Sequence, residues 1–467
     1  MEVFCIKNKT IYVCSNCGYE SPKMAGKCFN CNEWNTFVEK DVDSKSETHV
    51  SPLQRRRSNP IVKLTDIVST NSHRIVTGIK EFNRVMGGGI VKDSVTIITA
   101  RPGAGKSTLL LQVAHDIASS GYKVLYASGE ESDSQIKNRA DRILDRLSDN
   151  IWVVSDTSMD NVISAIDNID PDLIIVDSIQ TFTLDEFQGS RAGSPTQTMG
   201  CANELVRIAK DGDRPRAVII VGQMTKNDEI AGLRALEHLV DTVLVIEGER
   251  EEELRSLLAT KNRFGGTGEM GFFSMTEKGL ISIDNPSEYF MTRREKKEAV
   301  SGSALAVIKE GSRPIIVEIE SLVSNSFTPF PSRIGECLRR EQLNTLISIL
   351  EQRGCQQLFN KNVVIKTTGG IYLKEQASNL AVIMSIVSSI YDKGIPCDTV
   401  FISDVGLTGE LKKVPSLEGR IKELDRMGFK NVYVAQNSLG KNVKFDNINV
   451  LECKTLQEVI KHVFSIK

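Results

Sequence analysis

The stretch 101-RPGAGKSTLLLQ-112 could bind the phosphate groups of a nucleoside triphosphate. Its two glycines, Gly103 and Gly105, would let backbone N–H groups approach phosphate oxygens closely. Lys106 would contact the β- and γ-phosphates, and Ser107 would ligate Mg²⁺. The residues predicted to hold the phosphates are Gly103, Ala104, Gly105, Lys106, Ser107 and Thr108.

The phosphate-loop pattern G-x-x-x-x-G-K-[ST] begins with a glycine, where this chain has Ala100. The departure is mild because Gly103 and Gly105 keep the loop able to approach phosphates. The apolar run 95-VTIIT-99 precedes the loop, and 107-STLLLQVAHDIA-118 is typical of a helix. A strand, a loop and a helix in this order favour a phosphate loop over a chance glycine-rich turn.

Two acidic positions could complete the hydrolysis of a bound triphosphate. Asp177 ends the apolar run 173-LIIVD-177 and would hold the water shell of Mg²⁺. The run 123-KVLYA-127 leads into two glutamates, and a carboxylate at this strand tip can polarise a water near the γ-phosphate. Glu130 is the predicted base and Glu131 the competitor, and we expect one of the two to be solvated or to cap a helix.

Four of the ten cysteines are clustered with the spacing Cys14-x2-Cys17-x10-Cys28-x2-Cys31. Two C-x-x-C pairs on a short connector can place four thiolates around one Zn²⁺. A segment this small cannot bury enough surface alone, so the metal would supply the folding free energy. A rubredoxin-like iron site uses a similar set of ligands and stays open at this stage.

The elements that must position these residues follow from the pattern of short apolar runs. Parallel strands buried on both faces are continuous and rich in β-branched residues. The five runs of this kind are 95-VTIIT-99, 123-KVLYA-127, 173-LIIVD-177, 217-AVIIV-221 and 242-TVLVIE-247. They predict an α/β domain with a parallel sheet. The predicted division of the chain is a zinc ribbon at 1–38, a linker at 39–60, an ATPase domain at 61–284, a connector at 285–300 and a further domain at 301–467.

Composition limits the possible partners. The formal net charge of the 467 residues is −2, so any contact with nucleic acid must come from local patches. No apolar run approaches the ~18 residues of a membrane span. The stretch 380-LAVIMSIVSSIY-391 is shorter and is predicted to be a buried helix. We expect a soluble, cytoplasmic protein with no membrane contact.

Several motifs occur in a fixed order along the chain. They are the cysteine cluster, 77-TGIKEFNRVMGGG-89, the phosphate loop, 128-SGEES-132, 174-IIVDSIQT-181 and 261-KNRFG-265. In this the chain resembles the bacterial RadA/Sms family of recombination and repair ATPases, over nearly its whole length. The resemblance implies a RecA-like ATPase core followed by an α+β domain shaped like the Lon protease domain. It also implies a hexameric ring on single-stranded DNA that drives branch migration of recombination intermediates, with a RecA-type recombinase as partner.

The resemblance assigns further site residues. A ring ATPase needs a cation that reaches the γ-phosphate from the neighbouring subunit, and Lys261 and Arg263 match those positions. Which of the two has this role is open, and a basic surface turn is the plainer interpretation. Gln223 would sense the γ-phosphate, although the family usually has histidine there and RecA-like ATPases more broadly use glutamine.

The segments 185–200 and 225–238 would face the DNA. Their candidates for phosphate contact are Arg191, Lys226 and Arg234.

The C-terminal part raises two alternative functions. Lon proteases use a Ser nucleophile with a Lys base, and the matching positions here are Ala377 and Glu418. Both catalytic partners are missing, which argues against an ATP-dependent peptidase and favours a scaffold. A KaiC-like signalling ATPase would share the 77-TGIKEFN-83 start, but it explains neither the cysteine cluster nor the KNRFG motif.

Overall fold

The computed structural model describes most of the chain from residue 74 onward and parts of the N-terminal region. The described residues are 10–14, 20–21, 23–24, 26–28, 34, 37–41, 63–66, 74–223, 233–248, 253–292, 294, 299–440 and 443–465. The chain divides into two compact units, Met1–Ser69 and Thr70–Lys467. Each unit is described by itself.

The N-terminal unit holds a three-stranded antiparallel sheet in the order β2-β1-β3. The strands are β1 (Thr10–Cys14), β2 (Glu20–Ser21) and β3 (Phe37–Asp41). Because Thr10 pairs with Asp41, β3 continues three residues into the predicted linker. Cys28 is buried, whereas Cys17, Cys31 and the side chain of Cys14 lie outside the described residues.

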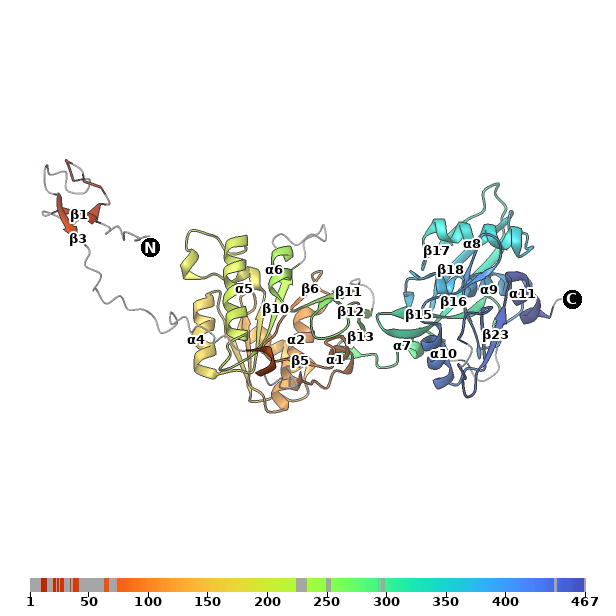
Figure 1. The fold of residues 1–467 in the computed structure, drawn as a ribbon, viewed down its shortest axis with the longest axis horizontal. Coiled ribbons are helices and arrows are strands. Elements are labelled where there is room, and N and C mark those ends of the chain that lie inside the picture. The colour runs from red at the N-terminus through yellow and green to blue at the C-terminus, as the bar shows by residue number, and fades with distance from the viewer. Residues whose placement is uncertain are drawn as a thin grey trace. The chain divides into compact units, whose positions relative to one another are not determined.

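A nine-stranded sheet forms the first half of the second unit (Figure 1). Its strands are β6 (Val95–Ala100), β7 (Val124–Ser128), β8 (Ile151–Ser155), β9 (Leu173–Asp177), β10 (Ala217–Gln223), β11 (Thr242–Glu247), β12 (Leu254–Asn262), β13 (Met270–Thr276) and β14 (Gly279–Ser282). The order is β14-β13-β12-β11-β6-β10-β9-β7-β8. The six strands β11, β6, β10, β9, β7 and β8 are parallel. Strands β12, β13 and β14 add an antiparallel extension beside β11.

The parallel strands predicted from the apolar runs are confirmed. Every residue of β6, β7 and β9 is buried, because helices cover both faces of the sheet. On one face lie α1 (Lys80–Val85), α2 (Lys106–Ser119) and α3 (Asp133–Ile143), and on the other α4 (Met159–Ile169), α5 (Pro195–Ala209) and α6 (Leu233–Leu239). Edge strand β8 and the antiparallel extension were not among the predicted runs.

A second, mixed sheet of seven strands forms the C-terminal half, in the order β17-β18-β16-β15-β19-β22-β23 (Figure 1). Its strands are β15 (Ser303–Glu310), β16 (Arg313–Asn325), β17 (Arg333–Gly335), β18 (Lys361–Thr367), β19 (Thr399–Ile402), β22 (Asn431–Ala435) and β23 (Asn449–Cys453). Helices α8 (Arg340–Arg353), α9 (Asn379–Tyr391) and α11 (Leu456–Phe464) cover one face, and α10 (Leu417–Arg426) covers part of the other.

Helix α9 is the predicted buried helix, and its residues from Asn379 to Ser388 are all buried. Among the described parts of the chain, the helices are all too short or too polar to traverse a bilayer.

The predicted connector is in part a packed element. Helix α7 (Pro286–Tyr289) begins it, and the ring of Phe290 is fully buried against Phe272 of β13, with 5.4 Å between ring centroids. Further on, Arg294 forms an ion pair of 2.5 Å with the buried carboxylate of Glu318 on β16. The connector is therefore attached to both sheets.

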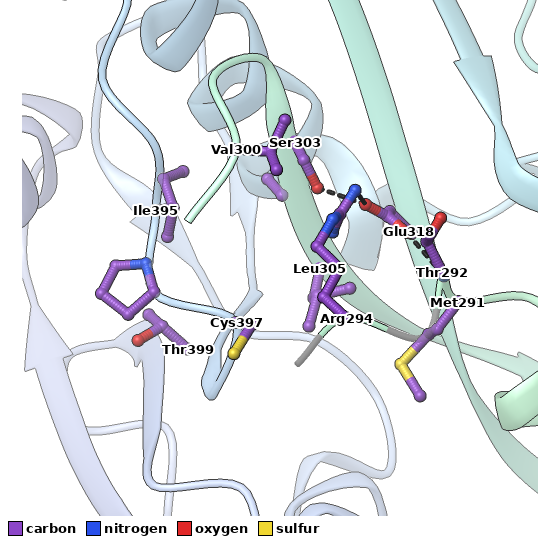
Figure 2. A pocket seen from close by; sticks show the side chains of 12 residues that line it. Met291, Thr292, Arg294, Val300, Ser303, Leu305, Glu318, Ile395, Cys397 and Thr399 are labelled. Atoms are coloured by element: carbon purple, nitrogen blue, oxygen red, sulfur yellow. Dashed lines mark hydrogen bonds and ion pairs between the residues drawn. The ribbon is translucent and has the colours of Figure 1, made fainter. Parts of the chain in front are cut away.

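Glu318 lies at the edge of a cavity of about 60 Å³ (Figure 2). The hydroxyl of Ser303 and the backbone N–H of Thr292 also donate to its carboxylate, at 2.5 and 2.8 Å. Burial by itself would raise the pKa of Glu318, but these hydrogen bonds and Arg294 outweigh burial and lower the pKa. Glu318 is thus held as a carboxylate.

Candidate functional site

The phosphate loop joins β6 to α2, as the motif predicts. Gly103 and Gly105 have φ values of 85° and 100°, a left-handed conformation that favours glycine. Helix α2 begins at Lys106, so its first backbone N–H groups are free to bind an anion at the loop. Ala100 ends β6 with a negative φ, and its carbonyl accepts a hydrogen bond of 3.0 Å from the Lys106 ammonium. The position that usually carries glycine therefore needs none here.

The carboxyl ends of four neighbouring strands bring the predicted residues together. The phosphate loop follows β6 and Glu130 follows β7, while Gln223 and Asp177 are the last residues of β10 and β9. These four strands are adjacent in the sheet. Ligands of open parallel sheets bind at this edge. Burial lowers the pKa of Lys106, and the charges of Asp177 and Glu130 oppose that effect, so both carboxylates act on the loop lysine.

Asp177 is held by a buried tyrosine that sequence reasoning missed. Tyr126 of β7 donates a hydrogen bond of 2.7 Å to the Asp177 carboxylate. Burial and the charge of Asp177 raise the pKa of Tyr126 well above the ordinary value, so the hydroxyl keeps its proton. The hydroxyl of Ser107 and the carboxylate of Asp177 are oxygen ligands of the kind that Mg²⁺ prefers.

Glu130 has contacts that suit a base for an attacking water. Its carboxylate accepts hydrogen bonds from the Ser178 hydroxyl and from the Gln223 amide, the latter at 2.6 Å. The segment between β7 and Glu130 packs closely against Thr181, because a Cβ atom on Gly129 would lie 2.1 Å from the Thr181 hydroxyl. The structure therefore brings Glu130 and Gln223 into contact. It also adds Ser178, which lies in the 174–181 motif but had been given no role.

Glu131 is engaged elsewhere. Arg139 of α3 donates to both of its carboxylate oxygens, one contact measuring 2.7 Å. The cap of α3 is Ser132, which forms a capping box with Gln135. Of the two glutamates, Glu130 is therefore the one that faces the other strand-end residues.

An open cleft of about 600 Å³ lies beside the phosphate loop. It is bounded by Thr108, the end of α3 and the turn between β13 and β14, and its lining residues are Thr108, Arg142, Ile143, Met275, Thr276, Glu277, Lys278 and Gly279. Its size falls within the range of small-ligand sites.

The remaining predicted residues have other contacts, are exposed, or lie outside the described residues. Lys261 contacts the end of α6, and Arg263 contacts Asp241. Arg191 is exposed in the segment before α5. Lys226 lies outside the described residues, and so does the side chain of Arg234 in α6.

The positions that match a Lon dyad hold no catalytic pair. Ala377 is buried, and the adjacent Ser378 is fully buried with its hydroxyl donating to the Glu375 carbonyl. Glu418 forms an exposed ion pair of 2.6 Å with Lys422, one turn along α10.

Two protein-family models and several known proteins match this chain. Residues 12–39 match the family described as Rubredoxin metal binding domain, and residues 58–229 match the family described as AAA domain. The DNA repair protein RadA of Streptococcus pyogenes is 41% identical over 460 residues, covering 98% of this chain and 100% of the relative. The chain belongs to the RadA family. RadA proteins of Listeria monocytogenes and Bacillus subtilis are also 41% identical, each over 97% of this chain and 98% of its own length.

The RadA relatives match the chain almost from end to end, so family membership extends over the ribbon, the nine-stranded sheet and the C-terminal sheet. The resemblance recognised in the motifs is thereby confirmed. A solved structure of the RadB recombinase matches 45% of the chain and 100% of its own, at 22% identity and a TM-score of 0.36.

Proposed function

We propose that this protein is a DNA-dependent ATP hydrolase of DNA repair and homologous recombination. The observation that carries the proposal is the contact of Glu130 with Gln223, beside the phosphate loop and Asp177. This contact links Glu130, the proposed base for the attacking water, to the end of β10. The segment predicted to face DNA begins directly after that strand. The names of the RadA relatives support the role in DNA repair.

The proposed mechanism assigns each strand-end residue a task. The backbone of Gly103–Thr108 and the ammonium of Lys106 bind the triphosphate of ATP, and its nucleoside occupies the cleft beside Thr108. Ser107 and Asp177 would hold Mg²⁺, which supplies positive charge against the phosphates. Glu130 accepts a proton from the attacking water, while the Ser178 hydroxyl orients the carboxylate.

Gln223 would couple hydrolysis to DNA. Its amide donates to Glu130, and the chain continues from it into residues 224–232 and then α6. Binding of single-stranded DNA next to Gln223 would move the amide and change the orientation of the base. In a hexameric ring this coupling would drive branch migration, with Arg191, Lys226 and Arg234 on DNA phosphates and a recombinase as partner.

The terminal regions have supporting roles in the proposal. Cys14, Cys17, Cys28 and Cys31 would bind structural zinc in the cytoplasm, which agrees with the metal-binding family matched at 12–39. We propose domain boundaries at 60, 284 and 300, as predicted, and an end of the ribbon at Asp41 instead of 38, because β3 runs to that residue. Residues 301–467 would form a Lon-like scaffold without peptidase activity.

The proposal is tested by ATP turnover with and without single-stranded DNA. We expect DNA to raise turnover of the wild type, and Lys106→Ala to abolish it, because the γ-phosphate loses its cation. Lys137→Ala is the matched control, since Lys137 is an exposed lysine on α3 that pairs with Asp141. Turnover that ignores DNA, or that survives in Lys106→Ala, would contradict the proposal.

A further inference from the structure

The phosphate loop carries a second cation, Arg101, besides Lys106. Arg101 begins a tight turn, in which the backbone N–H of Ala104 donates to the Arg101 carbonyl at 3.2 Å. The middle of this turn is Pro102 and Gly103, the latter with a φ of 85°, and these residue types are typical of a rigid type II turn. Because proline has no N–H, Pro102 cannot donate to a phosphate as the other backbone amides of the loop can. The guanidinium of Arg101 can supply donors in its place.

One side of the loop is packed and the other is open. Ala104 is 4% exposed, and a Cβ atom on Gly105 would lie 2.5 Å from the Cε atom of Met275. Residues 101–103 are exposed. The packed part holds the loop backbone in place, and the open part, which begins with Arg101, is accessible to a nucleotide.

Arg101 lies at the end of the loop where the γ-phosphate of ATP would be. The cleft for the nucleoside is beside Thr108, at the other end of the loop, so the triphosphate would run from Thr108 toward Arg101. Ala100, the residue before Arg101, is paired with Gln223 across β6 and β10. The Gln223 amide in turn donates to Glu130 at 2.6 Å. Arg101 therefore follows directly on the strand position that is paired with the partner of the proposed base.

The charges at the strand ends favour a further cation at this place. Burial lowers the pKa of Lys106, and the charges of Asp177 and Glu130 act on the same lysine. One ammonium thus stands against two carboxylates before a triphosphate adds its own negative charge. During transfer of a γ-phosphoryl group, charge is spread over its three non-bridging oxygens. A planar guanidinium can donate two parallel hydrogen bonds to such oxygens.

We propose that Arg101 is a catalytic residue that donates to the γ-phosphate of ATP from within the phosphate loop. This inference rests on the proposed function and adds a residue to it. The oxygen of the attacking water bonds to the γ-phosphorus, and the water proton passes to Glu130. The bond from that phosphorus to the bridging oxygen breaks, and ADP leaves with the electron pair. Arg101 balances the negative charge of the non-bridging oxygens during this step.

Equilibrium binding of two nucleotides to the full chain with Mg²⁺ tests the proposal. The nucleotides are ADP and a non-hydrolysable ATP analogue with an imido bridge between its β- and γ-phosphates. We expect Arg101→Met to weaken binding of the analogue about tenfold, because a charge-assisted hydrogen bond is lost, and to leave ADP binding within about twofold. Retained ADP binding also shows that the variant is folded. Arg101→Lys keeps the charge and should restore most of the affinity for the analogue.

Arg142→Met is the matched control, because Arg142 is an exposed arginine that lines the nucleoside cleft. It should change the affinities for ADP and for the analogue by the same factor, since both contain the nucleoside. ATP turnover of Arg101→Met should fall about 100-fold. Equal changes for the two nucleotides in Arg101→Met, no change for either, or turnover like that of the wild type would overturn the proposal.

Failure of the proposed function would look different. It would appear as wild-type turnover that ignores single-stranded DNA or that survives in Lys106→Ala, whereas the binding comparison contains no DNA. If turnover depends on DNA and on Lys106 as proposed, and Arg101→Met binds the analogue like the wild type, only the role of Arg101 is lost.

Discussion

At the scale of residues, the site depends on side chains that hold the charged groups in place. Asp177 keeps its orientation through the Tyr126 hydroxyl, and Glu130 through Ser178 and Gln223. Both carboxylates have donors from neighbouring strands, which fixes them before any nucleotide binds. This pre-organisation is what a hydrolytic site requires.

Tyr126→Phe tests the support of Asp177. Phenylalanine fills the same buried space, so we expect normal folding but about a tenfold loss of turnover at limiting Mg²⁺, because the carboxylate loses a hydrogen bond to a charged group. A titration of ATP turnover against Mg²⁺ measures the loss. Tyr122→Phe, on a tyrosine that contacts Lys92 away from the site, should behave like the wild type. Equal Mg²⁺ dependence of Tyr126→Phe and the wild type would exclude a role for the hydroxyl.

Local spacing predicted the roles of Lys106, Asp177 and Glu130, because each lies at or just after the end of an apolar run that is typical of a buried strand. It could not predict Tyr126 or Ser178. Their roles depend on β7 and β9 lying side by side, with Ser128 paired to Asp177. Such register is a tertiary property that a single sequence does not display.

At the scale of elements, the connector is more than a spacer. The charged run at 285–300 predicted a connector, and the structure adds that Phe290 is buried and that Arg294 forms an ion pair. These contacts could not be predicted because the partners of the two residues, Phe272 and Glu318, are distant in sequence. The strands of the parallel sheet were predictable because burial on both faces leaves a continuous apolar run.

The connector contact predicts a pH dependence of stability. The pKa of Glu318 is lowered in the folded protein, so its stabilising effect is complete above the ordinary glutamate pKa. It is lost as pH falls through the lowered folded value. In thermal unfolding from pH 7 down to pH 3, we expect the wild type to lose more stability in acid than Glu318→Gln does. Parallel curves for the two proteins would show that the carboxylate is not held in its charged form.

At the scale of the whole molecule, the second unit joins its two sheets by packing and by charge. Arg313, the first residue of β16, forms an ion pair of 2.9 Å with Glu81 of α1. The backbone N–H of Ser312 donates to Glu269 at 3.0 Å. Met270 and Phe272 of β13 belong to the same hydrophobic core as the C-terminal strands and helices. An α/β part followed by an α+β part was predictable, but this shared core was not, because it depends on how the surfaces of the two parts fit together.

A shared core predicts joint unfolding of the two sheets. In calorimetry of residues 70–467 we expect one transition for the wild type, because neither sheet is buried correctly without the other. Arg313→Met should lower the midpoint and separate a second transition, since the buried carboxylate of Glu81 loses a cationic partner. Lys366→Met is the control, as its pair with Glu320 is exposed. Two transitions in the wild type would contradict the shared core.

The central claim is that Glu130, and not its neighbour, activates the water. The most direct measurement is ATP turnover with single-stranded DNA for Glu130→Gln and Glu131→Gln, with nucleotide binding measured on both. We predict that Glu130→Gln loses about 100-fold or more in turnover while still binding ATP. Glu131→Gln should stay within a few-fold of the wild type, because Glu131 pairs with Arg139 on α3. Full turnover in Glu130→Gln, or the larger loss in Glu131→Gln, would contradict the account.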